Sequence, residues 1–567
     1  MKKAVEYLRR ASHVEGSLPP TLITILLIAL TVYTIAVTPA SFGFYHDDGI
    51  YVATAKALAT GQGYRIISLP GEPLQTKSPP LHPFLLSLVW RAHPDFPENL
   101  FPMMILSVLA AVGSLFLTWH YLTRQGYASN WQVILIVSLV ALNWRTVILA
   151  SGIYVEMFYM ALSIAGLYLA EEYEKSRTTW IIGTALGVVL GLLFLTRTAG
   201  ITLLIAVAFY YVLRRQITKA FIPIALGCSF VVGWAAWGYL NRPTAEGVNS
   251  AYYESYLQTL TGIIHEAQAE TGRSALEVLI SIVGKNLLIV LVLTVPLICL
   301  GLPFDWPRQF DSHLFIPIVI LLLLIFVLIL VGFLKQISSG IRLIHIYVVC
   351  YLGLHLIWPY SGYDRFLMPL LPFLLYFIMV ALQLFSLLVG KEVGASSRLS
   401  RTVIVVVIAG AAIGAASLTS YNYGSGIYRA LTSLKHKNLE RAAEDAEAIR
   451  WINENADPLD VLICYRDPMY YLYTGRKATR SSLLQEGGKT EGNRASPGER
   501  ANTIFTIVRE NNARYLIYTS ADMELEFQAD DYKQEYKKLL DQTSEVFNPV
   551  FECSNGRCTI YRIDSLR

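Results

Sequence analysis

Apolar segments long enough to cross a lipid bilayer recur along most of this chain, and they constrain its fold more than any other feature. A helix of about 20 apolar residues spans the hydrocarbon core, and a helix bonds all of its own backbone groups inside lipid. The sequence therefore predicts a mainly α, polytopic helical membrane protein with about 11–13 spans. The segments lie at roughly 21–37, 101–120, 131–150, 154–171, 180–196, 199–213, 219–240, 285–303, 314–334, 343–358, 365–389 and 401–419.

The composition agrees with a membrane protein. The 567 residues are 54% hydrophobic and 16% charged, whereas soluble domains carry about 25% charged residues. The formal net charge is only +4, which gives no indication of a nucleic acid partner. The lipid bilayer is the first partner that the sequence predicts.

The basic residues predict the orientation of the chain, because short loops rich in Lys and Arg stay in the cytoplasm. A basic start, Met1-Lys2-Lys3, precedes the first apolar segment, which is longer than the core of a cleaved signal and is interpreted as an anchor. We expect a multi-pass protein of the cell inner or plasma membrane with a cytoplasmic N-terminus and an exoplasmic first loop at 41–100. The basic residues of the early cytoplasmic loops are Arg124, Lys175, Arg177, Arg214, Arg215 and Lys219.

The second half of the chain gives two conflicting indications. Basic residues at 335–342 and 391–401 place the C-terminal tail outside, whereas strict alternation of all the segments places it inside. One segment therefore does not span the membrane once. We expect this segment to be 285–303, where Pro296 favours a re-entrant hairpin or a broken helix. The short pair of segments around Arg197 is the alternative.

The composition becomes polar and mixed after about residue 425. The sequence predicts a membrane domain of residues 1–425, with a second exoplasmic loop at about 241–284, and an exoplasmic soluble α/β domain of residues 426–567. A helix-like run and three strand-like runs support the α/β class. They lie at 438–452, 461–465, 515–518 and 559–563.

Two cysteines of the tail, Cys553 and Cys558, flank a predicted hairpin. Asn555-Gly556 favours a two-residue type I′ turn, which makes the cysteines a non-hydrogen-bonded pair within disulfide range. A disulfide would indicate an oxidising compartment. The alternative is two free thiols in a cytoplasmic domain.

Two adjacent carboxylates, Asp47 and Asp48, follow the first apolar segment. Charged groups beside a bilayer are costly and mark functional sites. One carboxylate could act as a general base on a hydroxyl while the other orients it or holds a divalent cation, although nothing in the sequence requires a cofactor. The alternative is that both acids only flank the N-terminus of a helix that begins near Gly49.

Four more charged residues are predicted to lie at the same face of the membrane. Lys77, in a proline-rich stretch, suits an anion such as a lipid phosphate, and Arg365 and Arg197 can bind phosphate through paired N–H donors. Glu156, at the outer end of an apolar helix, is expected to support the aspartates. The alternatives are interfacial anchoring for the basic residues, including a local Asp364–Arg365 pair, and a locally satisfied carboxylate for Glu156.

The stretch at 42–85 contains the acidic pair followed by Gly-Ile-Tyr, then Ala-Lys-Ala-Leu-Ala-Thr-Gly-Gln-Gly-Tyr, then Lys-Ser-Pro-Pro-Leu. This stretch resembles the first exoplasmic loop of C-type (GT-C) glycosyltransferases. The similar families are the protein O-mannosyltransferases, the lipid A aminoarabinose transferases and related bacterial families. The runs Tyr154–Glu156, Leu195-Thr196-Arg197 and Asp364-Arg365-Phe366 also resemble that family.

The resemblance implies that an acid of the first loop is the catalytic base and that basic residues hold the phosphate of a polyprenyl-phosphate carrier. The base is Asp47 as first choice or Asp48, since many relatives have Asp-Glu or a single acid there. The phosphate-binding residues implied are Lys77 and Arg365, with Arg197 as a further candidate. Further candidate contacts to the site, a metal or the acceptor are His46, His82 and Tyr363.

The resemblance thus implies an inverting membrane glycosyltransferase that moves a sugar from a polyprenyl-phosphate donor to a hydroxyl of a lipid, glycan or protein acceptor on the outer face. The competing interpretation is a polytopic transporter or flippase of a lipid-linked or small anionic substrate. A transporter is expected to carry its charged residues near the middle of the membrane, whereas here they gather at one face.

Overall fold

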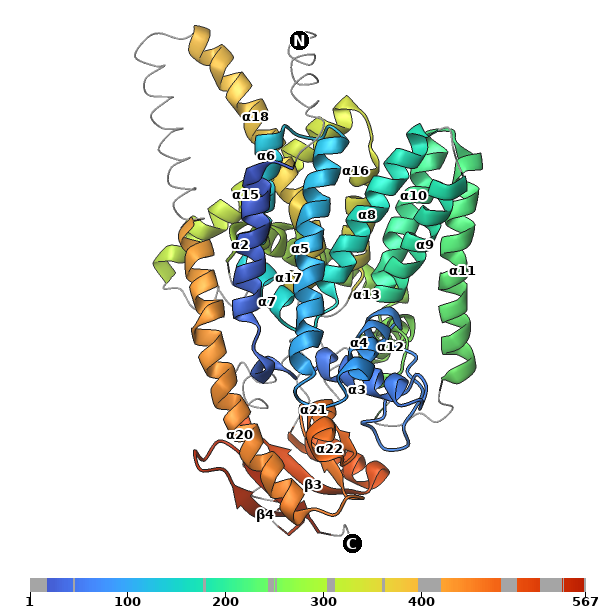
Figure 1. Cartoon of the computed structure of the whole chain (residues 1–567), viewed down its shortest axis with the longest axis vertical. Coiled ribbons are helices and arrows are strands. Elements are labelled where there is room, and N and C mark those ends of the chain that lie inside the picture. The colour runs from blue at the N-terminus through green and yellow to red at the C-terminus, as the bar shows by residue number, and fades with distance from the viewer. Residues whose placement is uncertain are drawn as a thin grey trace.

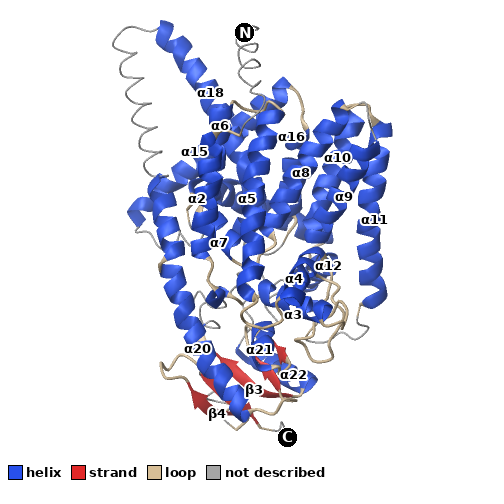
Figure 2. Cartoon of the chain, viewed as in Figure 1, coloured by secondary structure: helices blue, strands red, loops and turns tan. Residues whose placement is uncertain are grey.

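The protein is mainly helical, with a bundle of long helices above a small domain that contains a β-sheet (Figure 1). Figure 2 shows that strands occur only in this lower domain among the parts drawn in colour. The predicted fold class, a helical membrane protein with a C-terminal α/β domain, is confirmed. The computed structural model describes residues 18–43, 46–176, 180–242, 249, 252–302, 312–358, 363–395, 420–480, 497–520, 543 and 545–564.

The helical bundle is built from consecutive helices with mostly short connections. Its elements are α2 (Pro20–Ala36), η1 (Pro39–Ser41), α3 (Asp47–Ala59), α4 (Leu81–Ala92), α5 (Leu100–Arg124), α6 (Asn130–Leu142), α7 (Trp144–Ser151), α8 (Glu156–Lys175), α9 (Trp180–Thr196), η2 (Thr198–Gly200), α10 (Ile201–Leu213), α11 (Ile217–Asn241), α12 (Tyr256–Thr271), α13 (Ala275–Asn286), η4 (Leu287–Thr294), α14 (Val295–Leu300), α15 (Ser312–Ser339), α16 (Leu343–Leu356), α17 (Tyr363–Leu367), η6 (Met368–Leu370) and α18 (Leu371–Ala395).

Fewer single helices are long enough to span a membrane than the sequence predicts. Within the described residues, five helical runs are long and apolar enough to cross: Leu100–Arg124, Ile217–Asn241, Ala275–Leu300, Ile318–Ser339 and Asp364–Leu387. The bent pair α6–α7 passes as a sixth, while α2, α9, α10 and α16 are apolar but shorter. These shorter helices do not reach the length of about 20 residues that a span needs. The expected segment 401–419 lies outside the described residues. The chain is a multi-pass membrane protein.

The broken helix predicted at 285–303 is found elsewhere. The elements α13, η4 and α14 follow one another directly and form one helical run, Ala275–Leu300. Pro296 follows the π-helical stretch η4 without breaking this run. The break lies instead between α6 and α7, which differ in direction by 61°. Asn143 at this bend accepts from the backbone N–H of Arg145 (3.1 Å) and donates to the Ile298 carbonyl (2.8 Å). Asn143, which lies inside an apolar run, thus caps the N-terminus of α7 and hydrogen-bonds a carbonyl of α14.

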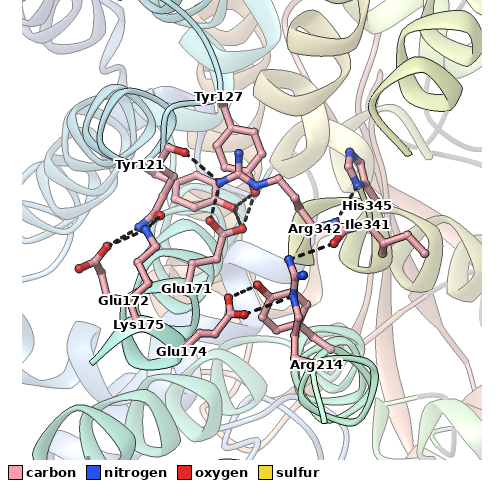
Figure 3. Close-up of polar contacts among 12 residues, drawn as sticks. Tyr121, Tyr127, Glu171, Glu172, Glu174, Lys175, Arg214, Ile341, Arg342 and His345 are labelled. Atoms are coloured by element: carbon pink, nitrogen blue, oxygen red, sulfur yellow. Dashed lines mark hydrogen bonds and ion pairs between the residues drawn. The ribbon is translucent and has the colours of Figure 1, made fainter. Parts of the chain in front are cut away.

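An ion-pair network joins the helices at the end of the bundle away from the sheet (Figure 3). Glu171 of α8 accepts from the Arg342 guanidinium (2.9 Å) and from the Tyr127 hydroxyl. Glu174 pairs with Arg214 of the α10–α11 turn at 3.2 Å. Buried charges are tolerated when they are paired and hydrogen-bonded in this way. The network brings the basic loops after α5, α8 and α10 to one end of the bundle.

The first loop, 41–100, folds across the opposite end of the bundle as the short helices α3 and α4. Helix α3 begins at Asp47, in agreement with the helix expected near Gly49. It stops before Gly61 and Gly63, whose φ angles are +79° and +84°, a region that favours glycine. The loop therefore places the two aspartates in the first turn of a helix.

The second loop, predicted at about 241–284, lies against the first loop and includes α12 and the start of α13. Helix α13 already begins at Ala275, because the Ser274 side chain caps its N-terminus together with Glu277. The Thr76 hydroxyl of the first loop donates to the Tyr253 carbonyl at 2.7 Å. Both loops thus form one layer between the helices and the C-terminal domain.

The C-terminal domain contains a five-stranded mixed sheet with the order β2-β1-β3-β5-β4. Strand β1 pairs in parallel with β2 and β3, and β5 pairs antiparallel with β3 and β4. The predicted helix and strands are confirmed, while two strands and two helices were not anticipated. The elements are α20 (Ser433–Asn455), β1 (Val461–Ile463), α21 (Asp467–Thr474), β2 (Ala478–Thr479), α22 (Pro497–Asn511), β3 (Ala513–Tyr518), β4 (Phe547–Glu552) and β5 (Thr559–Ile563).

The hairpin between β4 and β5 differs from the predicted two-residue turn. The Gly556 N–H donates to the Cys553 carbonyl and the Cys553 N–H donates to the Cys558 carbonyl, both at 2.9 Å. The hairpin loop is therefore longer than two residues, and Gly556 takes a positive φ of +66° within it. Because Cys553 and Cys558 are hydrogen-bonded to each other, the prediction of a non-hydrogen-bonded cysteine pair is wrong. Both cysteines are buried thiols in this structure, and burial with a hydrogen bond between them raises the pKa of Cys558. The disulfide stays a prediction.

Candidate active site

Asp47 and Arg365 meet where the first loop covers the ends of the bundle helices. Asp47 is the first residue of α3, and Arg365 lies in α17, a short helix ahead of α18. The guanidinium of Arg365 donates to Asp47 Oδ2. The Arg365 side chain is 14% exposed, whereas that of Asp47 keeps 39% of its surface exposed. The pair thus presents one accessible carboxylate on a buried cation.

Glu156 extends this pair into a charged cluster. Glu156 is the first residue of α8 and its side chain is only 1% exposed. Its Oε1 lies 3.1 Å from Arg365 Nε and 3.3 Å from Arg197 Nη1. The Arg197 guanidinium also lies 4.5 Å from the Phe366 ring centroid, a cation–π contact. Glu156 therefore bridges two arginines, and its role in supporting the aspartates stays a prediction.

The charges around Asp47 keep it ionised. Burial among the neighbouring segments would raise the pKa of Asp47, but the charge and hydrogen bond of Arg365 outweigh this effect and hold that pKa below its ordinary value. The charges of His46 and Lys77 act in the same direction. The cluster contains three strong bases, Arg365, Arg197 and Lys77, against the carboxylates of Asp47 and Glu156. These three basic groups suit an anionic ligand.

Asp48 differs from its neighbour. It is 1% exposed, and its two carboxylate oxygens accept from the backbone N–H groups of Gly43 and Gly49, each at 2.8 Å. Burial raises the pKa of Asp48 to about 6 despite these two bonds. Asp48 therefore ties the first turn of α3 to the backbone at Gly43, and its catalytic role stays a prediction.

Lys77 lies at the edge of the cluster. Its backbone N–H donates to the Gln75 side chain at 2.9 Å, which fixes the turn that the prolines begin. Its ammonium group lies 5.8 Å from the Tyr256 ring centroid. The second loop thus supplies an aromatic wall beside the lysine.

The other three predicted site residues, His46, His82 and Tyr363, lie in different surroundings. His46 hydrogen-bonds Asp467 of the C-terminal domain at 2.7 Å. His82 packs edge-on against the Tyr51 ring, with ring centroids 5.0 Å apart, and burial lowers its pKa to about 3, so its imidazole is neutral. Tyr363 begins α17, and its side chain lies outside the described part of the structure.

Sequence reasoning missed Arg145, Tyr51 and Asp467. Arg145 of α7 pairs with Asp364, and Arg365 donates to Asp47, while the local Asp364–Arg365 pair stays a prediction. A charged residue within an apolar segment was the available signal for Arg145. Tyr51 follows Asp47 by one helical turn on the same face of α3, a spacing that could have singled it out.

The two aspartates do not fit a cation held between them. Successive residues on a helix diverge by about 100°, and here Asp47 pairs with Arg365 while Asp48 accepts two backbone N–H groups. Among the described residues, no group of three or more His, Cys, Asp and Glu side chains could hold a metal ion.

Comparison with known proteins identifies the fold. No family model and no curated protein matches the chain, but solved structures do. The oligosaccharyltransferase of Archaeoglobus fulgidus, solved with Zn and sulfate, is 12% identical and has a TM-score of 0.52, with 95% of this chain and 72% of that chain covered. The chain has the GT-C glycosyltransferase fold.

Two other structures were found with this GT-C fold. The same archaeal enzyme, AglB, in complex with an inhibitory peptide and a dolichol-phosphate, is 11% identical with a TM-score of 0.50, covering 96% of this chain and 74% of that chain. ArnT from Cupriavidus metallidurans, bound to undecaprenyl phosphate, is 13% identical with a TM-score of 0.47, covering 96% and 98%. In the present GT-C chain, the cluster of Asp47, Arg365, Glu156 and Arg197 lies where the helices meet the first loop.

Proposed function

We propose that this chain is an integral membrane glycosyltransferase that moves a sugar from a polyprenyl-phosphate donor to an acceptor hydroxyl, with Asp47 as the general base. The observation that carries the proposal is the accessible carboxylate of Asp47, kept ionised by the buried guanidinium of Arg365. A base must be unprotonated and reachable by the proton it removes. The GT-C fold supports the reaction class, and the dolichol-phosphate held by AglB supports a donor of this kind.

The reaction is a single displacement with inversion at the anomeric carbon. The acceptor oxygen forms a bond to that carbon as the bond from the carbon to the phosphate oxygen breaks. The acceptor proton passes to Asp47, and the polyprenyl phosphate leaves with the bonding electron pair. Cationic groups placed where this negative charge develops lower the barrier. Arg365 and Lys77 act on the charge of Asp47, and Arg197 joins the cluster through Glu156.

Arg365 has two roles in this proposal. It is bonded to both Asp47 and Glu156, so a carboxylate–guanidinium–carboxylate row exists before substrate binds. A donor phosphate beside Arg365 would share the guanidinium with these carboxylates. The positive charges of Lys77 and Arg197 favour such an approach.

The first experiment measures sugar transfer from a panel of labelled polyprenyl-phosphate sugars by the purified protein in lipid bilayers. We expect label to leave one or more donors, and to do so with wild type but not with Asp47→Asn. Labelled donor or lipid that crosses the bilayer of sealed vesicles without release of the sugar would instead favour the transporter or flippase. The experiment also identifies the sugar, and added acceptors identify the hydroxyl.

We further propose that the C-terminal domain and the first loop are exoplasmic and that Cys553 and Cys558 form a disulfide there. The basic loops gather at the other end of the bundle, which suits a cytoplasmic side. We expect a variant with only these two cysteines, denatured without reductant, to resist thiol labelling until it is reduced. A variant with only Cys464, a buried cysteine of the same domain, should be labelled at once. Labelling of Cys553 and Cys558 before reduction would contradict the disulfide.

A further inference from the structure

The segment Arg466–Met469 of the C-terminal domain packs against the chain on both sides of Asp47. A Cβ atom on Gly43 would lie 3.0 Å from Met469 Sδ, and one on Gly49 would lie 3.1 Å from Pro468 Cβ. Glycine at both positions lets the start of α21 approach the first turn of α3 this closely. The two helices lie one above the other in Figure 1.

Between these two glycines, His46 contacts the same segment through its side chain. His46 Nε2 lies 2.7 Å from Asp467 Oδ1, and the two side chains are 9% and 0% exposed. Asp467 Oδ2 has no hydrogen-bond partner within the described part of the chain, so the bond to His46 matters more to this buried carboxylate. The ring of His46 also packs against Tyr252 of the second loop, with ring centroids 5.7 Å apart.

The backbone of His46 is strained. Its φ and ψ angles are 63° and −44°, which a residue with a side chain adopts only when its surroundings hold it there. His46 directly precedes Asp47, and its carbonyl accepts from the Ile50 N–H at 3.2 Å. A change in the His46 torsions would therefore turn the first residue of α3 and redirect the Asp47 carboxylate.

We propose that Asp467 is a positioning residue of the C-terminal domain that acts through His46 to hold Asp47 where it removes the acceptor proton. This inference rests on the proposed function, because it takes Asp47 to be the base. It makes the C-terminal domain a part of the catalytic machinery although Asp467 itself does not touch the substrate. The buried His46–Asp467 contact, the strained backbone and the two close glycine contacts all converge on the residue that precedes the base.

A double-mutant cycle tests the proposal. His46→Ala and Asp467→Ala are each expected to lower kcat about 10- to 100-fold, because a displaced catalytic group costs rate, while the donor KM stays within about threefold. The double variant should be no slower than the slower single variant, because both changes remove one contact. His46→Gln, whose amide can donate to Asp467, should recover part of the lost kcat. Effects that multiply in the double variant would overturn the proposal.

Lys477→Met is the matched control for general loosening of the domain. Lys477 donates to the Ile67 carbonyl at 2.6 Å and pairs with Glu72, so it also joins the domain to the first loop, but near Lys56 in the last turn of α3 rather than at Asp47 in the first. The kcat of this variant is expected within about twofold of wild type, because a change at a distant, independent site does not alter the effect of the His46–Asp467 contact. A loss equal to that of Asp467→Ala would overturn the proposal, because any docking contact would then have the same effect.

Hydrogen exchange supplies a readout that does not need transfer activity. The amides of Gly49 and Ile50 should exchange faster in both single variants than in wild type. In the double variant they should exchange no faster than in the single variants. If wild type releases sugar from no donor, the proposed function fails, while exchange still reports on the contact. If wild type is active and neither single variant changes the exchange, the positioning role is wrong and the proposed function stands.

Discussion

Replacing Asp47 by asparagine is expected to lower kcat by about 10²- to 10⁴-fold, the usual contribution of a general base. The amide keeps the shape of the side chain but cannot take the acceptor proton. The protein should still fold, because the carboxylate is 39% exposed and Arg365 keeps its bond to Glu156. Release of labelled sugar, measured beside the thermal unfolding midpoint of each variant, checks both expectations.

Two other aspartates are matched controls for this change. Asp95→Asn alters an exposed acid of the same loop and should leave transfer and stability unchanged. Asp48→Asn removes one of the two acceptors for the Gly43 and Gly49 N–H groups, so it should lower the unfolding midpoint and affect transfer less than Asp47→Asn. Full activity in Asp47→Asn would refute the assignment of the base, and a greater loss in a well-folded Asp48→Asn protein would move that role to Asp48.

Replacing Arg365 by glutamine is expected to lower kcat by about 10²- to 10³-fold, the cost of removing one preorganised electrostatic group. The change also leaves Asp47 without the charge that lowers its pKa. In wild type the base stays ionised until the pH falls through that lowered pKa. In the variant, burial raises the pKa of Asp47, so the acidic limb of the pH–rate profile should move to higher pH.

Arg342→Gln is the control for loss of a buried ion pair. Arg342 pairs with Glu171 at the other end of the bundle, at 2.9 Å, so this change should lower the unfolding midpoint but not the kcat of the folded protein. Its pH–rate profile should match that of wild type. An acidic limb that stays in place in Arg365→Gln would show that Arg365 does not set the protonation of the base.

Much of the fold could be predicted because lipid leaves a chain few choices. Apolar length predicted the helices, and the polar tail with its alternating runs predicted the α/β domain. The bend at Asn143 was missed, because an asparagine inside an apolar run does not by itself predict a helix break. Its hydrogen bond to the Ile298 carbonyl of α14 depends on how the helices pack. The cysteine hairpin was predicted too tight, because Asn-Gly is compatible with more than one loop length.

Residue types and their apolar neighbours were enough to select five charged candidates for the site. Asp47, Glu156, Lys77, Arg197 and Arg365 stand out because an ionisable group beside or within apolar segments is costly unless it is paired or used. That argument needs no coordinates, since it depends only on the residue type and its apolar neighbours. It could not tell Asp47 from Asp48, because both share the same local sequence.

Which groups contact one another at the site could be seen only in the folded structure. Arg365 and Asp47 are 318 residues apart and His46 and Asp467 are 421 apart, and no local periodicity encodes such pairings. The rotation of α3 directs Asp47 to a guanidinium and Asp48 to backbone N–H groups, although the two residues are neighbours. The role of each carboxylate therefore follows from the packing of distant segments around one helical turn.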